Sequence, residues 1–289
     1  MKYFIITLAL FNMYIPSAFS ATFNAVQGDV LRIEVPQTTP MITQAQAFGK
    51  TWPIYKHEGK RIAWIGVHLK TKIKKYPLIW SSTNKSWSDD IQVIKGSFRI
   101  SHIKVKKNMA SFDAASLKRI RADQRAIKKA YKTAVTTKNT WPEMIQPVEG
   151  IVSTPFAAQR YVNGEPRSPH SGLDIAAPEG TSVRAPLNAK VLLVSDMYLN
   201  GTLIALGHGD GLTTIYAHLK HSLVQEGQEL HQGDIFAEVG STGRSTGPHL
   251  HWGVHFSGAK INPKSMLKPT LSQTESNKIA VKENMHMQP

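Results

Sequence analysis

Three short segments in the second half of the chain hold side chains that can bind a metal ion or move a proton. The first contains His170 and Asp174, four residues apart. If this segment is extended, the two side chains point to the same face, because successive residues of a strand alternate between faces. A neutral imidazole beside a carboxylate forms half of a site for a divalent cation.

The second segment is His249-Leu250-His251, and the third is the isolated His218 at the end of an apolar run. On a strand, His249 and His251 also share a face, and the glycine-rich loop 240–248 would bring them to the edge of a site. Each spacing alone is also common among structural histidines. Together, in a chain without cysteine, they indicate a metal site built from histidine and carboxylate ligands.

In this order, the segments resemble the lysostaphin-type (LytM-like) zinc metallopeptidases. The resemblance rests on three motifs: His170-x-x-x-Asp174, Tyr216-Ala217-His218-Leu219 and Gly243-x-Ser245-Thr246-Gly247-Pro248-His249-Leu250-His251. The flanking run 172–181 belongs to the same pattern, and the resemblance covers about residues 145–263. Ala157 stands where the family often has glycine, and Phe236-Ala237 replaces a frequent Ile-Gly, both outside the motifs.

The resemblance implies an all-β peptidase domain, a duplicated hybrid motif, with its site in a groove on one face of a folded antiparallel sheet. His170, Asp174 and His251 would ligate one zinc ion per chain, and His218 and His249 would be catalytic without ligating. The substrate would be the peptide part of peptidoglycan. Three protein ligands leave a position for water. Because no HExxH motif offers a glutamate base, the two spare histidines would handle the proton.

The remaining histidines have simpler interpretations. His208, between glycines, is expected in a hairpin. On a strand, His255 would lie on the same face as His251, but its simpler interpretation is a position outside the groove. The others are expected on the surface or on strand faces: His57, His68, His102, His221, His231 and His286.

The elements that must position these residues follow a leader segment. Residues 1–20 combine a positive start, an apolar stretch and small residues before a cut near Ser20, which is typical of a secretory signal peptide. The apolar stretch is too short to cross a bilayer. We therefore expect export to the periplasm, or secretion, with no membrane span after the signal is removed.

Residues 21–110 alternate apolar and polar side chains over 29–35, 62–69 and 98–105, which predicts a small antiparallel β sandwich or barrel as an accessory domain. Residues 111–142 are expected to form a basic helix and linker. Its helix, over 113–135 with Asp113 as N-cap, either binds an anionic polymer or is a solvated linker.

Residues 143–263 are again rich in short apolar runs between glycines, so the fold class is mainly β throughout. This span is the expected zinc peptidase domain. Residues 264–289 are polar and weakly patterned, and a disordered tail is expected there. Whether the N-terminal region inhibits the enzyme or docks it to its substrate stays open.

The composition narrows the function further. The chain has 35 Lys and Arg against 20 Asp and Glu and a net charge of +15, which favours a polyanionic partner. Export argues against nucleic acid and leaves the cell wall. We expect a monomeric zinc metalloendopeptidase that hydrolyses peptidoglycan cross-links or stem peptides in cell wall organisation. The alternative is a non-catalytic, wall-binding activator of a peptidoglycan amidase.

Overall fold

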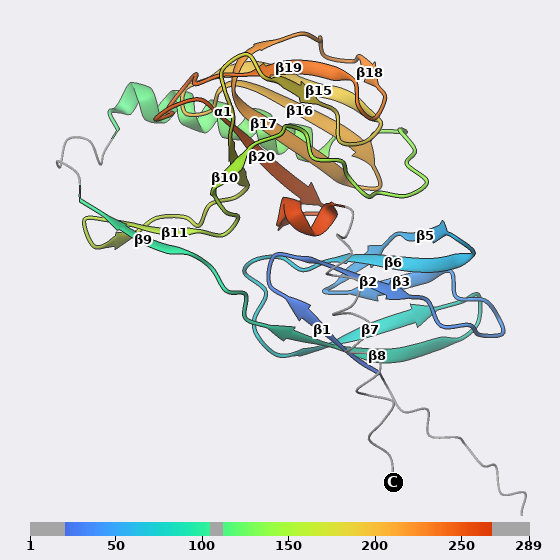
Figure 1. Ribbon diagram of the computed structural model, residues 1–289. Coiled ribbons are helices and arrows are strands. Elements are labelled where there is room, and N and C mark those ends of the chain that lie inside the picture. Colours follow the sequence, from blue (N-terminus) through green and yellow to red (C-terminus); the bar gives the residue numbers. More distant parts are fainter. Residues whose placement is uncertain (1–20, 105–111, 268–289) are drawn as a thin grey trace, which may run out of the picture.

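The computed structural model describes residues 21–104 and 112–267. The predicted signal peptide, residues 1–20, lies outside the described residues. The chain is mainly β, as the sequence predicts, with one long helix laid against the larger of two β-rich halves (Figure 1). Within the described ranges, no helix is long and apolar enough to cross a membrane.

The N-terminal half is built from two sheets around a tryptophan-rich core. Trp64, Trp80, Ile65 and Leu78 are fully buried there. A three-stranded sheet has the order β2-β6-β5, and a five-stranded sheet has the order β1-β8-β7-β3-β4. Their bounds are Thr22–Val26 (β1), Val30–Glu34 (β2), Gln44–Ala47 (β3), Lys50–Trp52 (β4), Ile54–His57 (β5), Lys60–Gly66 (β6), Lys75–Ser81 (β7) and Ser86–Ile94 (β8).

Two features of this half differ from the predicted antiparallel domain over 21–110. Strand β1 pairs with β8 in parallel, so the sandwich is mixed. Strand β9 (Ile100–Ile103) joins neither sheet and runs parallel to β11 (Gln159–Val162), which pairs in turn with β12 (Glu165–Pro166). Alternation predicts a strand but not its partner, so the sequence could not assign residues 100–103 to the C-terminal half.

Helix α1 (Ala114–Lys132) begins at the predicted N-cap, where the Asp113 carboxylate accepts a hydrogen bond of 2.6 Å from the Ser116 N–H. Ile120 and Ala130 are buried, and Ala130 packs on Ala205 of the large sheet. The helix ends three residues before the predicted end. Ala134, inside the predicted range, lies beyond that end and is exposed.

The C-terminal half is a ten-stranded sheet with the main order β10-β13-β20-β17-β16-β15-β18, all of whose neighbouring strands are antiparallel. Its strands are Ile151–Thr154 (β10), Leu173–Ala176 (β13), Ser182–Arg184 (β14), Ala189–Met197 (β15), Gly201–Gly209 (β16), Leu212–Ser222 (β17), Glu229–Leu230 (β18), Ile235–Val239 (β19), His249–Phe256 (β20) and Ala259–Ile261 (β21).

One hydrophobic core runs through both halves. Trp52 and Phe256 meet edge to face across the junction, with ring centroids 5.4 Å apart. The Arg32 guanidinium donates to the Ser265 and Leu267 carbonyl oxygens at 2.9 and 3.3 Å. The two halves are therefore held together by buried aromatic contacts and hydrogen bonds.

The described fold also continues past the predicted boundary at 263. A short 3-10 helix, η2 (Pro263–Met266), follows β21, and Met266 is fully buried. Residues 264–267 are thus folded against the core, because an apolar side chain in this polar stretch finds a buried position. The rest of the predicted tail, residues 268–289, lies outside the described residues.

Candidate metal and catalytic site

The site forms where β13 and β20 lie side by side. Asp174 is paired with His251 across the two strands, and Ala176 with His249. Leu173, Ile175, Leu250 and Trp252 alternate with these residues and are almost completely buried. Burial of the apolar side chains on one face therefore directs the carboxylate and the imidazoles to the other.

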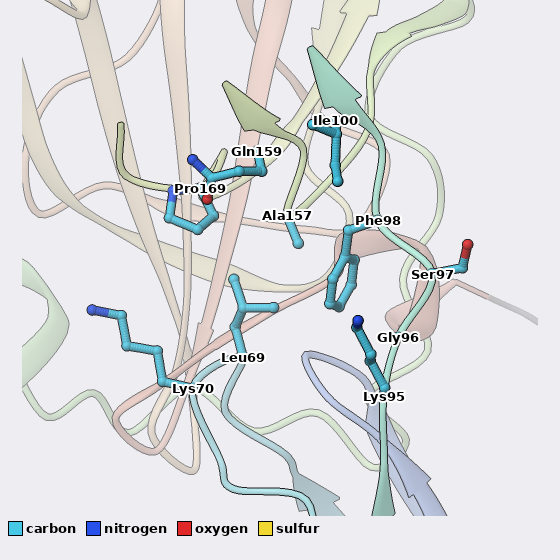
Figure 2. A pocket seen from close by; sticks show the side chains of 10 residues that line it. All are labelled: Leu69, Lys70, Lys95, Gly96, Ser97, Phe98, Ile100, Ala157, Gln159 and Pro169. Atoms are coloured by element: carbon cyan, nitrogen blue, oxygen red, sulfur yellow. The ribbon is translucent and has the colours of Figure 1, made fainter. Parts of the chain in front are cut away.

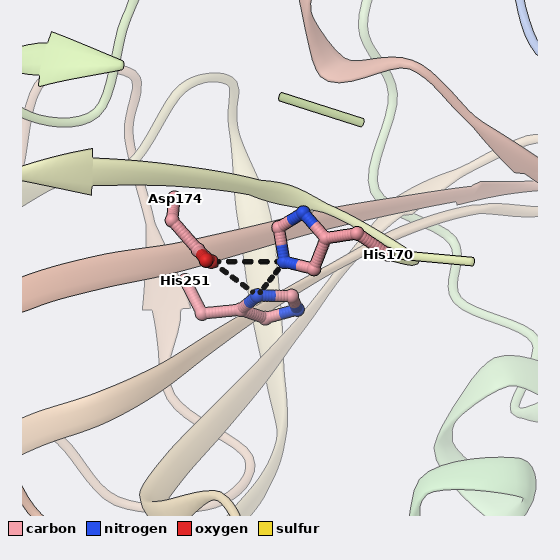
Figure 3. Close-up of side chains that lie close together, drawn as sticks. All are labelled: His170, Asp174 and His251. Atoms are coloured by element: carbon pink, nitrogen blue, oxygen red, sulfur yellow. Dashed lines mark hydrogen bonds and ion pairs between the residues drawn. The ribbon is translucent and has the colours of Figure 1, made fainter. Parts of the chain in front are cut away.

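Three donor atoms converge on this face (Figure 3). His170 Nε2 lies 3.0 Å from Asp174 Oδ1 and 3.1 Å from His251 Nδ1, and His251 Nδ1 lies 2.8 Å from Asp174 Oδ1. Two imidazole nitrogens and one carboxylate oxygen within 4.8 Å of one another are a donor set that suits a divalent metal ion.

The backbone makes room for this cluster at Gly172. A Cβ added there would lie 2.6 Å from the Trp252 carbonyl oxygen and 2.7 Å from Cε1 of His251. A side chain at this position would push the His251 ring away from the other two donors. Gly172 thus leaves the room that the His251 ring needs, and the three donors fit a His₂Asp site.

The orientation of His170 is fixed from outside the cluster. Its Nδ1 lies 3.0 Å from the Pro155 carbonyl oxygen, which can only accept, so Nδ1 carries the proton and Nε2 offers its lone pair. Burial is the main reason why the pKa of His251 is lowered, which keeps this ring neutral. Burial acts to raise the pKa of Asp174, but the interactions of its carboxylate with His170 and His251 outweigh burial and lower that pKa.

His218 and His249 lie next to the cluster and face each other, with ring centroids 4.7 Å apart. The centroid of His218 is 6.3 Å from that of His251. Each Nδ1 lies 2.9 Å from a carbonyl oxygen, that of Thr242 for His218 and that of Gly247 for His249. Both rings thus carry their proton on Nδ1, and the lone pair of Nε2 can accept a further proton.

His218 adopts a backbone conformation that few side chains take. Its φ is +61°, and its N–H donates to the Asn200 carbonyl oxygen at 2.8 Å. Such strain in a non-glycine residue is maintained only where the surroundings fix it, and it clusters at functional sites. Burial is the main cause that lowers the pKa of His218, so this imidazole is held in its neutral form.

All five residues predicted from the sequence are therefore brought together in one place. Two other histidines belong elsewhere. His208 ends β16 beside a hairpin, as expected, but its side chain is buried rather than on the turn. His255 does not line the site: its ring stacks on Tyr131 of α1, with centroids 4.1 Å apart.

The carbonyl groups that orient the rings were not predicted. Pro155, Thr242 and Gly247 act through backbone oxygens. The side-chain type at such positions does not report this role, so a single sequence contains no signal for it.

Comparison with known proteins agrees with this geometry. Residues 168–263 match peptidase family M23. The DD-carboxypeptidase/endopeptidase Mpg of Neisseria meningitidis is 36% identical over 129 residues, which are 45% of this chain and 30% of that protein. The peptidoglycan DD-endopeptidase ShyC of Vibrio cholerae is 31% identical over 150 residues, 50% of this chain and 31% of that protein. The chain thus spans less than a third of the length of these relatives.

A crystal structure assigned to peptidase family M23, from Pseudomonas aeruginosa, resembles more of the chain. It is 29% identical, with a TM-score of 0.66, over 84% of this chain and 94% of that one. The likeness extends beyond the matched domain into the N-terminal half. The match of residues 168–263 to peptidase family M23, the LytM type, confirms the resemblance given by the histidine motifs.

Proposed function

We propose that the protein is a zinc metalloendopeptidase that hydrolyses peptide bonds in peptidoglycan cross-links or stem peptides. The observation that carries the proposal is the convergence of His170, Asp174 and His251 beside the free Nε2 atoms of His218 and His249. The relatives named as peptidoglycan DD-endopeptidases support this substrate class. Because their name refers to bonds between D-residues, the D,D cross-link is the first bond to test.

In this mechanism His170, Asp174 and His251 would hold one zinc ion, with His170 oriented by the Pro155 carbonyl. When bound, zinc supplies a Lewis acid and makes water ionise near neutral pH. His218, kept neutral by burial, accepts a proton at Nε2 during attack on the peptide carbonyl. His218 then passes this proton to the leaving amine, and His249 stabilises the developing oxyanion when its Nε2 carries a proton.

The alternative, a non-catalytic activator of a wall amidase, has less support. Such a protein needs a binding surface. It does not need a complete set of metal ligands, nor a pair of histidines placed to transfer a proton. Here the donor atoms lie within 4.8 Å of one another, and Gly172 leaves the room that His251 needs. An intact constellation of this kind favours the enzyme.

Export follows from the same proposal. A peptidoglycan hydrolase acts outside the cytoplasmic membrane, and the leader-like residues 1–20 provide a route there. We propose that the protein works in the periplasm, or after secretion, as a monomer, and that its +15 charge favours the anionic wall.

The test is digestion of purified sacculi with the zinc-loaded protein, followed by mass spectrometry of the released muropeptides. Cleavage at a peptide bond that stops on chelation and returns with zinc supports the proposal. The control is His231→Gln, an exposed histidine outside the site, which should remain fully active. Absence of cleavage together with a gain in the activity of an added amidase would instead favour the activator.

A further inference from the structure

A cavity lies beside the metal cluster, at the junction of the two halves of the chain. It has a volume of about 600 Å³, in the range of pockets that hold small ligands. Residues from both halves line it, among them Leu69, Lys70, Lys95, Phe98, Ala157 and Pro169 (Figure 2). The catalytic domain thus forms only part of this cavity.

The cavity shares a wall with the metal site. Pro169 directly precedes His170, whose N–H donates to the Ala158 carbonyl at 3.0 Å. The Ala157 N–H donates in turn to the His170 carbonyl at 2.9 Å. The backbone that carries His170 therefore also forms part of the cavity wall.

The lining combines an apolar surface with positive charge. Leu69, Phe98, Ile100 and Pro169 provide the apolar part, and the exposed Lys70 and Lys95 provide two ammonium groups. Among the described residues that line the cavity, none is acidic. Among the described residues, none of the ion pairs includes either lysine.

Further cations surround Lys70 and make its neighbourhood more positive. The Lys70 N–H donates to His68 Nδ1 at 2.9 Å, and Lys260 lies across β20–β21 from His255. Burial and then the charges of Lys50, Lys70 and Lys260 lower the pKa of His68. A group of like charges without a carboxylate partner is unfavourable in the free protein and attracts an anion.

We propose that this cavity is a substrate subsite in which Lys70 and Lys95 bind a free carboxylate of the peptide undergoing cleavage. The occupant is an acidic peptide, whose aliphatic stem lies on Leu69 and Phe98 while its carboxylate meets the two ammonium groups. The N-terminal half then selects the substrate of the peptidase site. The inference rests on the proposed function, since it assigns a specificity pocket to that same site.

The test compares soluble cross-linked muropeptides that keep their free carboxylates with the same muropeptides converted to carboxamides. The double variant Lys70→Gln/Lys95→Gln should raise KM for the carboxylate form about tenfold, with kcat changed less than about threefold. Its preference for carboxylate over carboxamide should disappear. For the unchanged protein, that preference should shrink between low and high salt, because exposed charges are screened.

The matched control is Lys56→Gln/Lys85→Gln, which removes two exposed lysines of the same half that do not line the cavity. It should keep both KM and the preference. Equal KM values for the carboxylate and carboxamide muropeptides in the unchanged protein would contradict the proposed subsite. So would an equal loss of the carboxylate preference in the control variant.

A binding measurement separates this inference from the proposed function. The carboxylate and carboxamide muropeptides are titrated calorimetrically into the His249→Ala protein, with and without the two lysine substitutions. Lysine-dependent binding of the carboxylate form without cleavage by the unchanged protein keeps the subsite and rejects the peptidase. Cleavage without any carboxylate preference keeps the peptidase and rejects the subsite.

Discussion

His249 and His251 lie two residues apart on β20, and the proposed mechanism gives them different tasks. His251 Nδ1 lies 2.8 Å from the Asp174 carboxylate, inside the donor cluster. His249 donates from Nδ1 to the Gly247 carbonyl, and its ring faces His218. The same strand face therefore presents one ligand and one proton-handling group.

His251→Ala should strip the zinc and abolish cleavage, because His170 and Asp174 alone are too few ligands for a stable site. His249→Ala should keep about one equivalent of zinc while kcat falls on the order of 10²–10⁴-fold, the usual effect of losing an acid–base group. Elemental analysis of folded, dialysed variants and a muropeptide assay measure both. Zinc loss from His249→Ala with retention in His251→Ala would reverse the two assignments.

His208 illustrates a histidine whose role is structural. It is buried, its Nδ1 lies 3.0 Å from the Asn188 carbonyl, and its Nε2 lies 2.8 Å from the Thr214 hydroxyl. Burial lowers the pKa of His208 to about 4. In the unfolded chain, His208 therefore binds a proton near pH 6.5, whereas in the folded protein it binds one only near pH 4.

The contribution of His208 to stability is thus complete above pH 6.5 and is lost as the pH falls toward 4, by on the order of 3 kcal/mol. His208→Gln should flatten this part of the pH dependence of the free energy of unfolding. Urea denaturation between pH 7.5 and 4.5 measures it. His231→Gln, at an exposed position, serves as the control, and an identical slope in all three proteins would contradict the assignment.

The five site residues were predictable because their motifs are local in sequence. His249 and His251 are on the same strand, and Asp174 lies on the neighbouring one. The surroundings of His255 were not predictable, because its stacking partner Tyr131 is more than a hundred residues away on a helix. The odd or even position of a residue along a strand identifies the face on which its side chain lies. It does not identify the element that covers that part of the face.

At the scale of elements, α1 is a packed part of the C-terminal half rather than a free linker. Its Ala126 and Ile127 pack near Met197, Leu203 and Ala217 on the sheet. The Tyr198 N–H donates to the Asp123 carboxylate at 2.9 Å. The basic side chains of the helix are exposed, and one of them, Arg119, pairs with Asp196 of β15 at 3.2 Å. Packing and an exposed positive surface therefore coexist on one helix.

The sequence predicted the start of this helix but not its docking. Asp113 is recognisable as an N-cap from its type and position. Where an amphipathic helix packs depends on contacts far along the chain, which periodicity does not contain. For the same reason, the strand over 100–103 was predicted but assigned to the wrong half.

Ala130→Leu should lower the free energy of unfolding by about 1–3 kcal/mol. Ala130 is 4% exposed, and its side chain packs directly on Ala205 and Ile215 of the sheet. Added methyl groups have no space there. Ala115→Leu, on an exposed position of the same helix, should change stability by less than about 0.5 kcal/mol. Chemical denaturation of both variants makes the comparison, and equal effects would mean that α1 does not pack on the sheet.

At the scale of the whole molecule, the two halves behave as one hydrophobic unit. Trp141, which follows α1, lies edge-on to Trp64 at 5.1 Å and to Tyr55 at 6.5 Å. The Tyr55 hydroxyl donates to the Asp210 carboxylate at 2.9 Å, across the junction. A truncated protein without the N-terminal half would expose Phe256 and lose these contacts, so its activity would be difficult to separate from its instability.

Unfolding should therefore be a single cooperative transition that involves both halves. Phe256 is fully buried in the C-terminal half and packs against Trp52 of the N-terminal half. Phe256→Ala should lower the free energy of unfolding by about 3–5 kcal/mol. Because the halves are coupled, amide hydrogen exchange should accelerate in strands β6 and β8 as well as in β17 and β20. Mass spectrometry of exchanged peptides separates the halves, and faster exchange confined to the C-terminal peptides would show that the two halves unfold independently.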